Sequence, residues 1–132
     1  MDLTEKLPYV KRYQELIAYK KTMDLADAVF QETKSFPKEE VYSLTDQLRR
    51  ASRSAGAQIA EAWAKRNYIK HFISKLTDAS AELNETEHWL VIAHNCNYIS
   101  KTTRNDLVDL CYEINRLIYG MISKAELFCL SE

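Results

Sequence analysis

Apolar residues recur at alternating steps of three and four in four separate stretches, which together span most of the 132 residues. This spacing places each set on one side of an α-helix, which has about 3.6 residues per turn. Only two glycines and two prolines occur in the whole chain. An all-β protein needs many more such residues for its turns. The sequence therefore predicts an all-α fold.

The four predicted helices are joined by short connections, which favours an antiparallel up-and-down four-helix bundle. Pro37 suits the first turn of the second helix, and Ser100 or Thr103 can cap the fourth. We expect one domain over residues 1–132, with an N-terminal arm over 1–13 and a C-terminal tail over 126–132. The predicted apolar seams are Leu16, Tyr19, Met23, Ala26 and Phe30; Val41, Leu44, Leu48, Ala51, Ala55, Ile59 and Ala62; Phe72, Leu76, Ala79, Leu83, Thr86, Leu90 and Ala93; and Leu107, Leu110, Ile114, Leu117 and Met121.

The fourth helix and the tail carry more apolar residues than one seam requires. One face of a bundle helix needs only a stripe about 100° wide. Either the tail folds back on a deeply buried fourth helix, or another chain covers the surplus; we expect self-association. The additional residues are Cys111, Ile118, Ile122, Ala125, Leu127, Phe128, Cys129 and Leu130.

Charge is distributed unevenly along the chain, although the net charge is only −1. Residues 43–75 contain seven Lys or Arg against two acids, a balance of +5, whereas residues 76–100 contain four acids and no Lys or Arg. The near-neutral total argues against a uniformly basic coat for nucleic acid. The basic and acidic segments can pair within the bundle, pair between subunits, or form a polarised surface.

Composition and spacing also disfavour enzymatic chemistry, cofactors and membrane insertion. The three cysteines show no CxxC spacing, as in a reduced cytoplasmic compartment, and no apolar run approaches the ~18 residues of a membrane span. No glycine-rich phosphate loop or zinc-ligand spacing is present. Glu85 and His88 form one Glu-x-x-His motif, but di-iron bundles use two, so a metal-binding carboxylate bundle is only a remote alternative. We expect no catalytic residue, no metal and no cofactor.

The arginines of the second helix are the candidate functional residues. Arg49, Arg50 and Arg53 lie on an arc opposite the apolar seam, and Asp46 can pair with Arg50 four residues later. Ser52 points inward, so the Arg-Arg-Ala-Ser string is not an accessible kinase site. The basic zone extends through Lys65, Arg66 and Lys70, and Tyr68 can stack on a base.

Residues 36–67 resemble the signature of the four-helix-bundle proteins named for intervening sequences in bacterial 23S rRNA genes. The family pattern is Phe-Pro-x-x-Glu, then Leu-x-x-Gln-Leu-Arg-Arg-Ala, then Ser-x-x-x-Asn-Ile-Ala-Glu-Gly. This chain departs from it at Gln58 and Ala62, and has Ala55-Gly56-Ala57 where Ile-Pro-Ser is common; Gly56 allows another backbone to approach closely. The matches are Phe36, Pro37, Glu40, Leu44, Gln47, Leu48, Arg49, Arg50, Ala51, Ser54, Ile59, Ala60 and Glu61.

The resemblance implies a bacterial four-helix bundle that assembles as a ring-like homopentamer, and the cysteine usage described above predicts a cytoplasmic location. It also implies a fold shared with the accessory variability protein of diversity-generating retroelements, a basic pentamer that binds nucleic acid and a reverse transcriptase. The family has no established catalysis. Its name refers to where its genes can lie and does not itself imply binding to rRNA.

We therefore expect a non-enzymatic oligomer that binds RNA or a ribonucleoprotein. The predicted phosphate contacts are Arg49, Arg50, Arg53, Lys65 and Arg66. The alternative is a purely structural oligomer, in which these arginines form ion pairs with Glu82, Glu85 or Glu87 of a neighbouring subunit.

Overall fold

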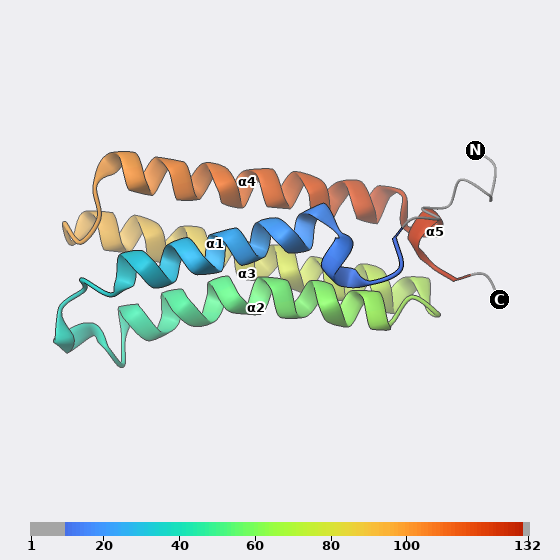
Figure 1. Cartoon of the computed structure of the whole chain (residues 1–132), viewed down its shortest axis with the longest axis horizontal. Coiled ribbons are helices and arrows are strands. Elements are labelled where there is room, and N and C mark those ends of the chain that lie inside the picture. Colours follow the sequence, from blue (N-terminus) through green and yellow to red (C-terminus); the bar gives the residue numbers. More distant parts are fainter. Residues whose placement is uncertain (1–9, 131–132) are drawn as a thin grey trace.

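The computed structural model describes residues 10–130, in which four long helices lie side by side (Figure 1). Consecutive helices run in opposite directions, and each packs against the next, with α4 returning to α1. This part of the chain contains no β-strand and confirms the predicted all-α bundle. The elements are η2 (Tyr13–Glu15), α1 (Ile17–Thr33), η3 (Lys38–Glu40), α2 (Leu44–Ala64), α3 (Ile69–Asn95), α4 (Lys101–Ser123) and α5 (Ala125–Phe128).

The buried faces of α2 and α3 agree with the predicted seams. Every predicted residue of the α3 seam is buried, and so is every predicted residue of the α2 seam except Val41, which is 46% exposed. Ser52 is also buried, and its hydroxyl donates to the carbonyl of Arg49. No helix of residues 10–130 has the length and apolar character needed to cross a membrane.

Leu16, directly before α1, is buried as predicted, but the predicted buried face within α1 was wrong by one residue. Met23 is 44% exposed, whereas the buried positions are Ala18, Thr22, Leu25, Val29 and Thr33. Both stripes have helical spacing, and one residue corresponds to a rotation of about 100°. The buried stripe contains two threonines, whose hydroxyls donate to backbone carbonyls of the same helix. Because these bonds satisfy the hydroxyls, both threonines can be buried. The less apolar stripe, which contains them, therefore faces the core.

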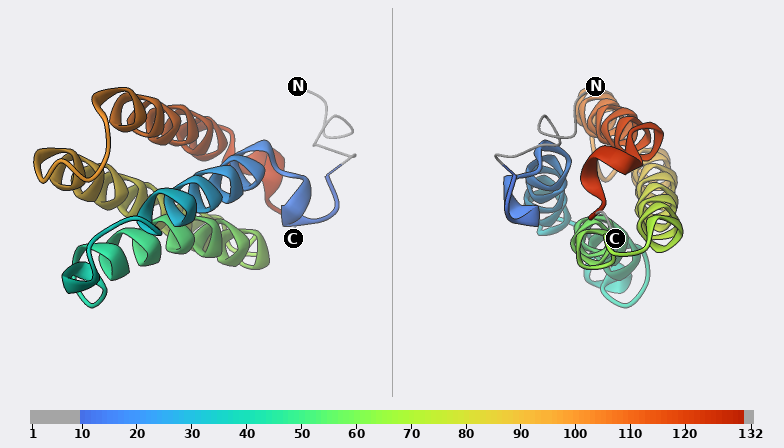
Figure 2. Two further views of the ribbon diagram at one scale, coloured as in Figure 1. Left: turned by 60° about the vertical axis from the view of Figure 1, so that its left-hand side comes forward. Right: turned by 90° about the vertical axis from the view of Figure 1, so that its right-hand side faces the viewer.

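Much of the apolar surplus of α4 and the tail is covered within the chain. Cys111 and Ile118 are buried together with Leu107, Ile114 and Met121. Figure 2 shows α5 crossing the end of the bundle between the long helices. There the ring of Phe128 stacks on that of Phe72 at 6.0 Å between centroids. Residues 126–130 of the tail thus follow the fold-back alternative, whereas residues 131–132 lie outside the described range. The surplus is weaker evidence for self-association than we expected.

Local signals account for the boundaries of the last two long helices. The hydroxyl of Ser100 accepts a hydrogen bond from the backbone N–H of Thr103 at 3.0 Å and caps α4 as predicted. At the end of α3, Asn97 adopts φ 63°, and the N–H of Tyr98 bonds to the carbonyl of Ala93. This is the hydrogen bond of a Schellman motif, in which asparagine tolerates the left-handed conformation. Pro37, by contrast, precedes the separate turn η3 and not the first turn of α2.

Candidate functional site

Three arginines converge on a small pocket at the beginning of α2. Arg53 follows Arg50 by three residues and Arg49 by four, so it lies on the same side of the helix as both. The pocket has a volume of about 330 Å³ and is lined by Val41, Thr45, Asp46, Arg49, Arg50 and Arg53. Because Asp46 is the only acid among these residues, the pocket carries a surplus of positive charge.

Uncharged groups of α1 hold two of these arginines in place. The Nε of Arg49 donates to Thr33 Oγ1 at 2.8 Å. The guanidinium carbons of Arg49 and Arg53 lie 4.6 Å and 5.6 Å from the centroid of the Phe30 ring. Cation–π contacts and a hydrogen bond to a neutral hydroxyl orient a guanidinium without neutralising it. Phe30, predicted as a core residue, is thus a platform for the arginines.

No arginine of α2 takes part in an ion pair within residues 10–130. The ion pairs there are Lys21–Glu113 at 2.9 Å, Lys75–Glu61 at 3.1 Å and Lys75–Asp78 at 4.0 Å. The expected pair between Asp46 and Arg50 is therefore not formed.

Arg50 instead acts electrostatically on Glu82 across the α2–α3 interface. Burial raises the pKa of Glu82, the neighbouring Glu85 carboxylate adds to the rise, and the positive charge of Arg50 opposes it. The basic helix and the acidic helix thus face each other in part within one chain.

Lys65 and Arg66 lie at the opposite end of α2 from the pocket (Figure 1). At about 1.5 Å per residue, the sixteen positions from Arg49 to Lys65 correspond to roughly 24 Å. Lys65 is exposed, but Arg66 lies over the Trp63 ring at 3.6 Å, and its Nε donates to the Trp63 carbonyl. Burial lowers the pKa of Arg66. The five predicted residues therefore do not form one site, and Arg66 contributes to packing.

The carboxylates of the alternative interpretation also have contacts within their own chain. Glu85 accepts a hydrogen bond from the Trp89 indole at 3.2 Å, and Glu87 accepts one from the Tyr112 hydroxyl at 2.8 Å. The His88 ring packs edge-on against Trp89. Within the described range, no three His, Cys, Asp or Glu side chains are grouped as a metal ion would require.

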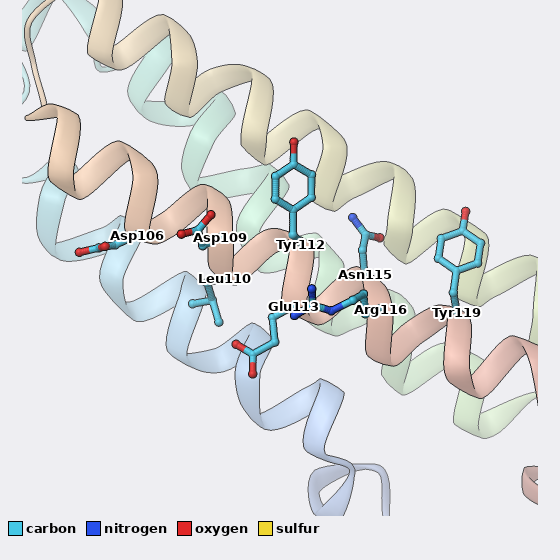
Figure 3. A pocket seen from close by; sticks show the side chains of 8 residues that line it. All are labelled: Asp106, Asp109, Leu110, Tyr112, Glu113, Asn115, Arg116 and Tyr119. Carbon is cyan, nitrogen blue, oxygen red and sulfur yellow. The ribbon is translucent and has the colours of Figure 1, made fainter.

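A larger groove runs along the outer side of α4, with a volume of about 860 Å³. Figure 3 shows that Tyr112, Asn115 and Tyr119 extend toward α3, whereas Leu110 and Glu113 extend toward α1. Its charged lining residues are Asp106, Asp109, Glu113 and Arg116, so acids outnumber bases and the groove disfavours phosphate.

Sequence reasoning missed two residues near the arginine pocket. Thr45 is only 4% exposed, and its Oγ1 has no hydrogen-bond partner among residues 10–130. Tyr42 is 93% exposed directly after Val41, although we named Tyr68, 62% exposed, as the stacking residue. The position of Tyr42 just before an arginine-rich helix was the available signal. No sequence signal could indicate that the Thr45 hydroxyl lacks a partner, because this depends on the packing around it.

Comparisons with known proteins identify similar sequences and a similar fold. The model of the family described as 23S rRNA-intervening sequence protein matches residues 14–120. A crystal structure of a protein of unknown function from the S23 ribosomal protein family of Bacteroides thetaiotaomicron VPI-5482 is 28% identical, with a TM-score of 0.72. The similarity covers 80% of this chain and 98% of that one. No curated protein matches the chain.

Proposed function

This chain belongs to the 23S rRNA-intervening sequence protein family, and we propose that it is a non-enzymatic, oligomeric protein that binds RNA or a ribonucleoprotein. The binding face is the basic side of α2. The solved relative is itself described as a protein of unknown function. The proposal therefore depends on the chemistry of this chain's own surface.

The observation that carries the proposal is the arginine pocket at the beginning of α2. Guanidinium groups form paired hydrogen bonds with phosphate oxygens, and a cluster of them raises the local concentration of a polyanion. Arg49, Arg50 and Arg53 line one concave surface, and none is neutralised by an ion pair within residues 10–130. The three guanidinium groups therefore keep their charge available for phosphate oxygens.

The first test is a titration of the purified protein against a structured RNA at low and at physiological salt. Wild type is expected to bind at low salt and to weaken steeply as salt rises, because phosphate contacts release counterions. The Arg49→Ala/Arg53→Ala variant is expected to bind less tightly. The slope of log binding constant against log salt concentration is expected to be shallower by about 1.5, because two phosphate contacts are lost.

A matched variant separates phosphate contact from a general loss of charge. Lys20→Ala/Lys101→Ala removes the same charge from two exposed residues outside α2 and is expected to bind almost as wild type does. Circular dichroism would show that both variants remain helical. If wild type fails to bind even at low salt while the arginine variant loses its oligomeric state, the arginines are structural and the proposal is wrong.

The proposed assembly is a homopentamer, the stoichiometry that the family resemblance implies. A mostly apolar groove of about 510 Å³, between the start of α1 and the end of α4, supports a surface for a second copy. Ile17, which lines it, is 62% exposed. Light scattering is expected to return five times the monomer mass of 15.4 kDa. A single 15.4 kDa species at micromolar concentration would contradict assembly.

A further inference from the structure

The arginine pocket contains a second feature that points to a ligand, namely a polar group without a partner. Thr45 lines the pocket together with the three arginines. The residue is 4% exposed, and its Oγ1 makes no hydrogen bond to any residue of the described chain. A buried hydroxyl normally has a partner, and leaving it without one is destabilising. The Oγ1 atom is itself buried, so a ligand oxygen in the pocket would supply that partner only after a rotation of the Thr45 side chain.

The pocket also presents its cations in a partly fixed arrangement. Arg49 uses its Nε for the bond to Thr33 Oγ1, and the two terminal nitrogens of its guanidinium make no hydrogen bond within residues 10–130. The Phe30 ring restricts the motion of both Arg49 and Arg53. Binding a phosphate to such groups loses less side-chain entropy than binding it to free arginines. Both observations favour an anion with several acceptor oxygens.

An exposed aromatic ring follows the first lining residue of the pocket. Tyr42 comes directly after Val41 and is 93% exposed, more than any other large apolar or aromatic residue of the described chain. Aromatic rings bind unpaired bases by stacking, and this is available only where bases are not already stacked in a duplex. Basic side chains for the backbone together with an exposed aromatic side chain for a base are typical of single-strand sites, and here the two are neighbours in the sequence.

We propose that this pocket binds a backbone phosphate of single-stranded RNA while a neighbouring base stacks on Tyr42. The arginines contact the phosphate, and a rotation about χ1 of Thr45 turns its hydroxyl toward a phosphate oxygen. The inference rests on the proposed function and deepens it. It places recognition at the beginning of α2, away from Lys65, and it selects single strands over duplexes.

Two substitutions test the hydroxyl and the ring separately. Thr45→Val removes the unpartnered hydroxyl at nearly constant volume, so it is expected to raise the melting temperature while weakening binding about tenfold, as expected for a lost bond to a charged group. Stability and affinity would then change in opposite directions. Thr45→Ser keeps a hydroxyl and is expected to retain binding. Tyr42→Ala is expected to weaken single-strand binding about tenfold, a typical effect for one lost stacked base.

The probes are a single-stranded oligouridylate of about a dozen nucleotides, an RNA duplex of equal length, and inorganic phosphate alone. Wild type is expected to prefer the single strand, and only single-strand binding is expected to respond to Tyr42→Ala. Tyr119→Ala is the matched control, because Tyr119 is a 54% exposed tyrosine on α4. It is expected to bind as wild type does.

The outcomes separate this inference from the proposed function. In one outcome, the duplex binds as well as the single strand, and the arginine double variant weakens both while Tyr42→Ala and Thr45→Val weaken neither. The basic face then binds RNA as proposed, but the single-strand site is wrong. If binding depends on Lys65 and Lys70 alone, the site lies where α2 ends and α3 begins, and the single-strand site at the arginine pocket is wrong. If inorganic phosphate stabilises the protein and no RNA binds, both proposals are overturned, and the pocket is a site for small phosphates.

Discussion

At the scale of single residues, the two glycines of the chain have opposite surroundings. A Cβ atom on Gly56 would lie 2.8 Å from Thr22 Oγ1, so glycine permits the close approach of α1 and α2 that the sequence suggested. Thr22 cannot easily yield, because its hydroxyl donates to the Tyr19 carbonyl at 2.6 Å. A Cβ on Gly120 would meet no heavy atom of residues 10–130 within 4 Å, apart from the neighbouring backbone of its own helix. Only the first glycine is therefore required by packing within the chain.

We expect Gly56→Ala and Gly120→Ala to have opposite effects on stability. Overpacking against α1 should lower the free energy of unfolding of Gly56→Ala by about 1–3 kcal/mol, even though alanine is the better helix former. Gly120→Ala should raise it by about 1 kcal/mol, because helix propensity acts there without a clash within the chain. Urea unfolding of both variants measures the difference. A higher free energy of unfolding for both variants would show that α1 moves aside freely and would contradict this prediction.

At the scale of secondary-structure elements, the predictions succeeded where one apolar stripe is clearly dominant. In α2 and α3 the predicted seams are the buried faces, apart from Val41. In α1 the stripe through Met23 and the stripe through Leu25 both have helical spacing, and packing against α2 and α4 buried the second. Apolar periodicity predicts that α1 is a helix but not which of its faces is buried. Its threonines donate to backbone carbonyls of the same helix, so they can be buried in place of apolar residues.

The N-terminus of α4 offers an element-scale prediction. Ser100→Ala removes the side-chain acceptor of the Thr103 N–H and is expected to lower the free energy of unfolding by about 1 kcal/mol. Thr102→Ala, at the exposed second residue of α4, is the control and should have an effect within about 0.5 kcal/mol. Thermal and urea unfolding measure both. Equal effects of the two substitutions would mean that solvent caps the helix as well as Ser100 does.

At the scale of the whole molecule, one hydrogen bond ties together the two connections at the same end of the bundle. The Tyr98 hydroxyl, between α3 and α4, donates to Glu40 Oε2 at 2.8 Å, and Glu40 belongs to η3 between α1 and α2. The Phe36 and Tyr98 rings also pack at 5.2 Å between centroids. The contact joins residues 58 positions apart, so no local pattern could indicate it.

This bond predicts a loss of stability at high pH. Donation to Glu40 and, to a lesser extent, burial raise the pKa of Tyr98 to about 12, whereas tyrosine in an unfolded chain has a pKa of about 10. The folded state holds the proton more tightly, so the contribution of the bond is complete below pH ~10 and is lost as the pH rises toward about 12. Absorbance titration of tyrosinate, with Tyr98→Phe for assignment, measures the pKa.

Glu40→Gln is expected to return the pKa of Tyr98 toward its ordinary value and to weaken the dependence of stability on alkaline pH. Glu39→Gln is the matched control, because the Glu39 charge contributes least among the causes of the shift. Identical tyrosinate titrations of wild type and Glu40→Gln would contradict the assigned cause.

Helical periodicity and the scarcity of turn residues were sufficient to predict four antiparallel helices, the inner faces of α2 and α3, and the outward position of the α2 arginines. These properties follow from the spacing of residues within one segment of the chain, so the sequence of that segment is sufficient to predict them. The inner face of α1, the return of the tail onto Phe72, and the separation of Arg49 from Lys65 depend on which helices meet and where they end. The unpartnered hydroxyl of Thr45 and the Phe30 platform arise only when α1 and α2 pack together, because burial and hydrogen-bond satisfaction are properties of the assembled bundle.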